Sequence, residues 1–174
     1  MKNKEQSIYA FIDSQNLNFG TSKDIFKNHK LGYSGWKLDM QKFRIYLRDK
    51  FRVQKAFLFI GYIKELERMY ESFRSFGYEL IFKTTVKGAD GKPKGNVDAE
   101  IVLNAARLKY DEFDKGVFVS GDGDFYCLYK FLEEKNKLCK IIIPNKFNES
   151  SLLKEFQNRK IFLYREKSKL ILKK

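Results

Sequence analysis

Four aspartates stand next to apolar segments in a chain that is otherwise rich in Lys and Arg. They are Asp13, which follows the run 7–12, Asp98, which opens the segment 97–110, and Asp122 and Asp124, which follow the run 116–120. Carboxylates gathered in a crevice repel one another and resist desolvation, so they usually need a compensating cation. Oxygen-only ligands favour Mg²⁺ or Mn²⁺.

A divalent cation held by carboxylates beside a basic surface suits phosphodiester hydrolysis. The cation lowers the pKa of a bound water and offsets the charge that develops on phosphate. This route needs no histidine, and the chain has a single one, His29. A serine or cysteine triad is therefore not expected, and we expect the four aspartates to be both the metal ligands and the catalytic residues.

Each aspartate also has a purely structural explanation. Asp13 could open a turn, and Asp122 or Asp124 could cap a helix that begins at Phe125. Capping needs one aspartate rather than two, and the two glycines of the turn, Gly121 and Gly123, indicate a backbone shaped for a ligand. These points favour a functional role for the 121–124 turn.

Asp98 lies in the first turn of an expected helix, where the helix dipole favours a carboxylate. A helical projection, however, places Asp98 near Val102 and Ala105, on an apolar arc turned toward the sheet. Glu100 falls on the opposite face, which is typical of a solvated residue. We therefore expect Asp98, and not Glu100, at the functional site.

Strands that alternate with helices must position these residues. The expected strands are 7–12, 53–60, 78–86, 116–120 and 138–143, with a short one at 160–164. The expected helices are 36–50, 63–76, 97–110, 125–135 and 150–157. The stretch between the first strand and residue 36 is polar. The alternation predicts a parallel sheet covered by helices on both faces. If the first strand is central, the strand order reverses beside it, and the loops after the first and fourth strands carry the chemistry.

Composition limits the class of protein. The 174 residues suit one domain, and 35 Lys and Arg against 22 Asp and Glu give a net charge of +13, which indicates a polyanionic partner, nucleic acid before membrane. No apolar run could span a membrane, so no membrane partner is expected. Cys127 and Cys139 lie on apolar segments without metal-ligand spacing, which fits a reducing cytoplasm. We expect a single domain over 1–165, followed by a basic tail over 166–174.

Three motifs in order, AFIDSQNL, GNVDAEIVLNAA and FVSGDGDF, resemble the NYN domain, the LabA-like branch of the PIN-like nucleases. The resemblance covers about residues 7–145. It implies a three-layer α/β/α Rossmann-like sandwich with about five mainly parallel strands and a metal-dependent ribonuclease site. The family's acidic residues carry over to the four aspartates, its Asn to Asn16 and its Ser to Ser120, both as catalytic residues. One departure is Asn104, where family members often have a further Asp.

Basic segments are candidates for holding the nucleic acid. Lys87, Lys92 and Lys94 lie in the Gly-rich loop or loose hairpin before Asp98, where they could grip phosphate or simply be solvated. Arg44 and Arg48 belong to the basic helix 36–50. The tail could act as an RNA arm, unless Ile171 and Leu172 pack on the domain.

These observations favour a cytoplasmic metal-dependent endoribonuclease that acts on RNA, with single-stranded RNA included, through Mg²⁺ or Mn²⁺. The alternative is a non-catalytic RNA-binding or regulatory module that retains the nuclease fold, which Asn104 and the basic charge favour. A third role is self-association as a homodimer through a Phe-rich surface.

Overall fold

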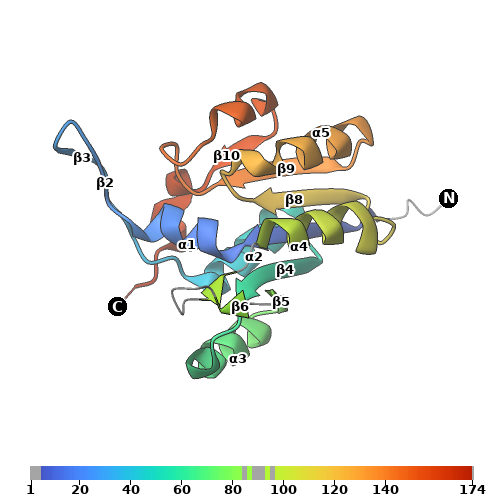
Figure 1. The fold of residues 1–174 in the computed structure, drawn as a ribbon, viewed down its shortest axis with the longest axis horizontal. Helices are drawn as coiled ribbons and strands as arrows, with labels where there is room; N and C mark the ends of the chain where they lie inside the picture. The colour runs from blue at the N-terminus through green and yellow to red at the C-terminus, as the bar shows by residue number, and fades with distance from the viewer. Residues whose placement is uncertain (1–4, 84–85, 88–92, 95–96, 174) are drawn as a thin grey trace.

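The computed structural model describes residues 5–83, 86–87, 93–94 and 97–173 (Figure 1). At its centre lies a six-stranded sheet. The strands are β1 (Ile8–Asp13), β4 (Lys55–Gly61), β5 (Tyr78–Lys83), β8 (Lys115–Val119), β9 (Leu138–Ile143) and β10 (Lys160–Phe162), in the order β10-β9-β8-β1-β4-β5. Every neighbouring pair is parallel, so all carboxyl ends meet at one edge of the sheet.

Side chains of β1 alternate between two apolar layers, as the period of a strand requires. Tyr9 and Phe11 pack with the helices α4 (Val97–Leu103) and α5 (Tyr126–Glu134) on one face. Ile8, Ala10 and Ile12 pack with α2 (Met40–Phe51) on the other face, where α3 (Glu67–Ser75) also contributes Phe73. The predicted three-layer α/β/α sandwich is confirmed.

The position of β1 decides where the site lies. β1 is hydrogen-bonded to β4 on one side and to β8 on the other, so the strand order reverses next to β1. The central first strand and the crevice between the first and fourth strands are therefore confirmed. The turn after β8 and the start of α1 (Ser14–Ser22) face each other across this crevice.

Several details differ from the sequence prediction. The sheet has six strands rather than about five, because the short β10 pairs with β9. The polar stretch after β1 forms α1 and an antiparallel hairpin of β2 (Ile25–Lys27) and β3 (Lys30–Tyr33). The expected hairpin before Asp98 is present as β6 (Val86–Lys87) paired with β7 (Pro93–Lys94). Val102 was expected to face the sheet, but it is 37% exposed and Ile101 is buried instead. Cys127, which lies on an apolar segment of the sequence, is exposed.

The helix that carries Asp98 changes pitch after Leu103 and continues as a π-helix over Asn104–Leu108. Asn104 is buried, and its side-chain amide donates to the carbonyl oxygen of Glu100 at 2.9 Å. The residue that departs from the family pattern therefore supports the helix backbone.

The last residues pack on the sandwich. After a 3₁₀ turn, Leu163–Glu166, the chain forms α6 (Lys167–Leu170), whose Leu170 is buried beside α2. Ile171 forms a bridge with Leu38, and the N–H of Leu172 donates to the carbonyl of Lys37. The structure therefore shows residues 167–172 packed on the domain, which was the alternative to a free RNA arm.

The Phe residues lie mostly in the two cores. Among the described residues Phe19 and Phe26 are the exposed ones, at 41% and 64%. The structure thus gives no support for a Phe-rich surface that would form a homodimer. No helix within the described ranges combines the length and apolar character that crossing a bilayer requires.

Candidate metal centre

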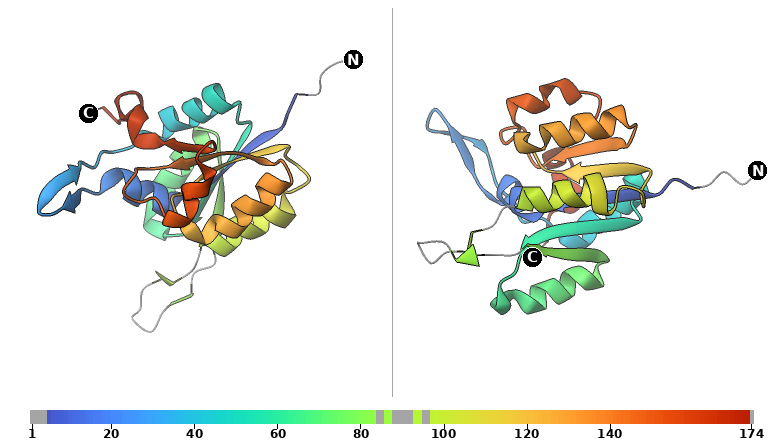
Figure 2. Two further views of the ribbon diagram at one scale, coloured as in Figure 1. Left: turned by 90° about the horizontal axis from the view of Figure 1, so that it is seen from above. Right: turned by 45° about the vertical axis from the view of Figure 1, so that its right-hand side comes forward.

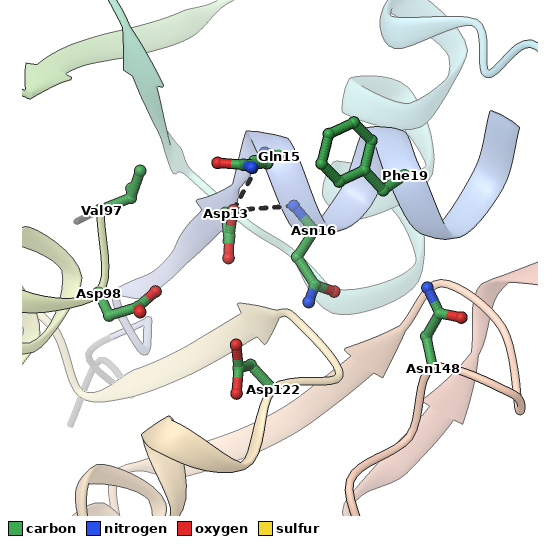
Figure 3. A pocket seen from close by; sticks show the side chains of 8 residues that line it. All are labelled: Asp13, Gln15, Asn16, Phe19, Val97, Asp98, Asp122 and Asn148. Atoms are coloured by element: carbon green, nitrogen blue, oxygen red, sulfur yellow. Dashed lines mark hydrogen bonds between the residues drawn. The ribbon is translucent and has the colours of Figure 1, made fainter. Parts of the chain in front are cut away.

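Asp13 has two roles at the end of β1. One carboxylate oxygen accepts hydrogen bonds from the backbone N–H groups of Gln15 at 3.0 Å and Asn16 at 2.9 Å, which caps α1. The side chain is 6% exposed, and Figure 3 shows its second oxygen pointing into a pocket. A single residue thus starts the helix and presents a carboxylate to the crevice.

Asp98, Asp122 and Asp124 converge on the same crevice from different elements. Asp98 lies in the first turn of α4, and the other two lie in the turn after β8. Each offers a carboxylate oxygen, and these three oxygens lie within 4.8 Å of one another. Two oxygens on opposite sides of one Mg²⁺ are about 4.2 Å apart, so the group is close to the size that an ion requires. Figure 3 shows Asp13, Asp98 and Asp122 pointing toward one another.

The carboxylates destabilise one another's charge. Burial raises the pKa of Asp13 above its ordinary value, and the nearby charges of Asp98 and Asp122 raise it further, while the hydrogen bonds from Asn16 and Gln15 act in the opposite direction. Burial of a carboxylate among like charges is the situation that a bound cation relieves.

A buried hydroxyl lies close to the same charges. Tyr129 on α5 is fully buried, and its hydroxyl has no hydrogen-bond partner among the described residues. Burial raises the pKa of Tyr129 well above its usual range, and Asp13, Asp122 and Asp98 act in the same direction. Buried polar atoms are normally satisfied. An orphaned hydroxyl near a hard-oxygen donor set therefore fits a centre that a cation and its hydration water complete.

Asn16 and Ser120 hold the turn that carries Asp122. The side-chain oxygen of Asn16 accepts from the N–H of Gly121 at 2.9 Å, and the Ser120 hydroxyl accepts from the N–H of Asp122 at 3.1 Å. Asp122 in turn caps the 3₁₀ turn by accepting from the N–H of Asp124 at 3.0 Å. Asn16 and Ser120 therefore position the acidic turn through its backbone.

Gly121 is required for the approach of a further loop. A Cβ at this position would lie 2.5 Å from the carbonyl oxygen of Asn148, and the N–H of Ser150 donates to the Gly121 carbonyl. The loop after β9 is thereby joined to the acidic turn, and the side chain of Asn148 reaches the pocket (Figure 3).

The acidic pocket has a volume of about 310 Å³, and some of its lining residues were not predicted. Besides Asp13, Asp98, Asp122 and Asn16, it is lined by Gln15, Phe19, Val97 and Asn148, whereas Asp124 is not among its lining residues. Asn148 follows the carboxyl end of β9, which meets the same edge of the sheet. The strand order alone could have pointed to it. Asn104 is not among the lining residues.

The arginines predicted to contact nucleic acid lie apart from the aspartates. The guanidinium of Arg44 donates to the carbonyls of Gly77, Val53 and Gln54, at the amino ends of β4 and β5. Arg48 lies one helical turn farther along α2 and pairs with Asp49. The structure thus places both arginines at the edge of the sheet opposite the acidic pocket. Lys92 and the side chains of Lys87 and Lys94 lie outside the described residues.

Comparison with known proteins agrees with this geometry. The model of the NYN domain matches residues 7–163. The fold is similar to the crystal structure of a protein of unknown function from Vibrio parahaemolyticus, with a TM-score of 0.72 and 20% identity over 99% of this chain and 100% of that one. No curated protein matches the chain. With its α/β/α fold, its acidic cluster and a family match over nearly its whole length, the chain belongs to the NYN domain family, which lies within the PIN-like nuclease superfamily.

Proposed function

We propose that the protein is a metal-dependent endoribonuclease. The observation that carries this proposal is the convergence of three carboxylate oxygens within 4.8 Å, next to the buried Asp13 with its raised pKa. Asp13, Asp98, Asp122 and Asp124 would hold one or two Mg²⁺ or Mn²⁺ ions. The ions, when bound, supply a more acidic water and charge neutralisation at phosphate.

The chain's own residues contribute positioning. Asn16 and Ser120 fix the turn that carries Asp122, and the cap by Asp13 fixes the start of α1. A net charge of +13 attracts the polyanionic substrate toward this acidic crevice. Catalysis would therefore combine fixed carboxylates with a surrounding basic surface.

Incubation of purified protein with a labelled RNA and Mn²⁺ tests the proposal directly. The wild type should cleave RNA, chelator should abolish cleavage, and Asp122→Asn/Asp124→Asn should reduce the rate by about 100-fold or more. Asp111→Asn changes an exposed carboxylate before β8, at the opposite edge of the sheet, and serves as a matched control. Full Mn²⁺-dependent cleavage by the double variant would refute the proposal.

The same assay separates the non-catalytic alternative. A regulatory module would bind RNA in a salt-sensitive manner without needing metal and would show no cleavage above background. We also propose action in the cytoplasm, because Cys127 and Cys139 are both free thiols, which fits a reducing compartment.

A further inference from the structure

A second pocket lies directly beside the acidic one. It has a volume of about 260 Å³ and shares Gln15 and Val97 with the acidic pocket, so the two pockets are adjacent. Its other walls come from the end of β4 and the connection to α3, including Tyr62, Ile63 and Leu66. A ligand bound at the aspartates would therefore extend into this second space.

The second pocket is lined mainly by apolar and aromatic side chains, whereas the first is lined mainly by acidic and polar ones. Tyr62, Ile63 and Leu66 are apolar or aromatic, yet they are 46%, 46% and 37% exposed. Ser14 and Gln15 add polar groups to the lining, and Lys83, at the end of β5, adds a positive charge. Exposed apolar side chains gathered at the mouth of a polar site are unusual on a surface and indicate binding.

Tyr62 is held in place although it is exposed. The hydroxyl of the buried Tyr70 donates to the carbonyl of Gly61 and accepts from the N–H of Ile63, both at 2.9 Å, so it anchors the backbone on both sides of Tyr62. The Tyr62 ring also stacks on Tyr70 at 5.8 Å and meets the edge of Phe82 at 5.3 Å. Its ring is thus a preorganised aromatic platform.

We propose that this second pocket is a subsite for one unpaired nucleobase next to the phosphate held at the acidic centre. An aromatic platform with apolar walls suits the face of a base, and the polar groups of Ser14, Gln15 and Lys83 suit its edge. The volume is below the roughly 300–1,000 Å³ of pockets for drug-sized ligands and fits a single ring system. This inference rests on the proposed function, because it takes a phosphodiester at the aspartates as its starting point.

The subsite has a consequence for the substrate. A base in a duplex is stacked on both faces and cannot place a face on Tyr62 without leaving the helix. The subsite therefore selects nucleotides that are already unpaired, and it fixes which phosphate reaches the aspartates. Selection would be tolerant of sequence, because every base has a π-face.

Binding can be measured without cleavage in an Asp122→Asn background, where asparagine retains the capping oxygen. The probe is a fluorescent single-stranded 12-mer RNA, and the readout is anisotropy. Tyr62→Ala should weaken binding by about 5- to 150-fold, the range expected for loss of one stacked base. Tyr62→Phe should bind as the parent does. Ile45→Ala, a similarly exposed apolar residue at 41% on α2, is the matched control and should also bind normally.

Abasic scanning then places the base. A series of oligomers, each with one abasic position, should reveal one position where the parent loses affinity and the Tyr62→Ala protein does not. This non-additivity is the signature of direct contact. A uniform response at all positions, or equal binding by Tyr62→Ala, would overturn the subsite.

The two proposals fail separately. Tyr62-dependent binding of single strands without Mn²⁺-dependent cleavage by the wild type would retain the subsite and refute the nuclease. Normal cleavage with no effect of Tyr62→Ala on affinity or on the position of the cut would retain the nuclease and refute the subsite. Absence of RNA binding would refute both.

Discussion

Asp13 shows how one side chain can be tied to the fold and to the site at once. Its capping oxygen is used by α1, while its burial and its acidic neighbours raise its pKa. The carboxylate therefore carries an energetic cost in the metal-free protein that the cap does not remove. A bound cation would remove this energetic cost, and the free energy recovered would add to the affinity for the metal.

Asp13→Asn should separate these two roles. Asparagine caps helices as well as aspartate does, so the fold should be retained. The unfolded chain releases the Asp13 proton near the ordinary pKa of 3.8, whereas the folded protein releases it at a higher pH. The wild type therefore loses stability as the pH rises through this window. In chelator at pH 7 the variant should have the higher Tm, and the difference should disappear below about pH 3.8.

Metal should reverse this order. At 100 times its Kd, Mn²⁺ stabilises a one-site protein by about 2.7 kcal/mol, and the wild type should show a gain of this order. Asp13→Asn should show little of it. Equal Mn²⁺-induced shifts in Tm for the two proteins would contradict a role for Asp13 in holding the ion.

Tyr129 and Tyr70 form a natural pair for a second prediction, because both are buried and, within the described part of the chain, only the Tyr70 hydroxyl has hydrogen-bond partners. Tyr70→Phe removes two hydrogen bonds and should lower the free energy of unfolding by about 1–3 kcal/mol. Tyr129→Phe removes an orphaned hydroxyl and should leave the metal-free stability unchanged or raise it by about 1 kcal/mol. Urea unfolding in chelator measures both.

If the Tyr129 hydroxyl belongs to the hydrated metal centre, Tyr129→Phe should also weaken Mn²⁺ binding by about 10-fold. Calorimetric titration measures this affinity. A variant that binds Mn²⁺ as the wild type does would show that the hydroxyl is only a packing defect.

At the scale of elements, the strands were predictable and the first helix was not. The apolar runs of β1 and β8 identify buried parallel strands, and the strand order follows from a central β1. In α1 the buried residues are Leu17, Gly20 and Thr21, which leave almost no apolar period to detect. The helix forms there because Asp13 caps it and because Gly20 allows Pro144 to approach, where a Cβ would lie 2.4 Å away.

Asp13, Asp122 and Asp124 were predictable for the same reason, since the carboxyl ends of parallel strands share one edge, whereas Asp98 was predicted from a helical projection. The positions of Arg44 and Arg48 were not. A basic helix face can be identified from sequence, but the end of the sheet that it reaches depends on how α2 packs. The three backbone carbonyls that Arg44 satisfies belong to the segments that enter β4 and β5, at the edge of the sheet opposite the acidic pocket.

The contact between α1 and the acidic turn gives a prediction at this scale. Asn16→Ala removes the acceptor for the N–H of Gly121 and frees the turn that carries Asp122. We expect a loss of about 1–2 kcal/mol in unfolding free energy and a fall of about 10- to 100-fold in Mn²⁺-dependent cleavage. Asn18→Ala alters an exposed residue of the same helix and should change neither. Cleavage by Asn16→Ala at the wild-type rate would show that the turn holds its shape without α1.

For the whole molecule, less of the net charge of +13 is available to bind a substrate than the composition indicates. In the tail, Lys169 pairs with Glu166, which also pairs with Lys50 of α2. Part of the tail's positive charge is therefore used in ion pairs that hold the tail against α2. Charge available to a substrate is better sought near the carboxyl edge of the sheet.

The β2–β3 hairpin extends beyond that edge (Figure 2). Lys27 and Lys30 on it are exposed, and the Lys27 ammonium lies 4.8 Å from the centre of the Phe147 ring, next to Asn148 of the acidic pocket. A strand that leaves the pocket along this side would pass both lysines. The hairpin thus gives the molecule a basic arm close to its acidic centre.

Lys27→Gln/Lys30→Gln should weaken binding of single-stranded RNA and reduce its dependence on salt. Each phosphate contact contributes about 0.7 to the slope of log K against log salt for single strands, so losing two should reduce the slope by about 1.4. Anisotropy titrations at several KCl concentrations measure it. Arg48→Gln/Arg52→Gln removes the same charge from the end of α2, near the amino edge of the sheet, and should leave the slope nearly unchanged. Equal reductions by both pairs would mean that RNA responds to the total charge of the molecule, and that the position of the hairpin beside the aspartates has no part in binding.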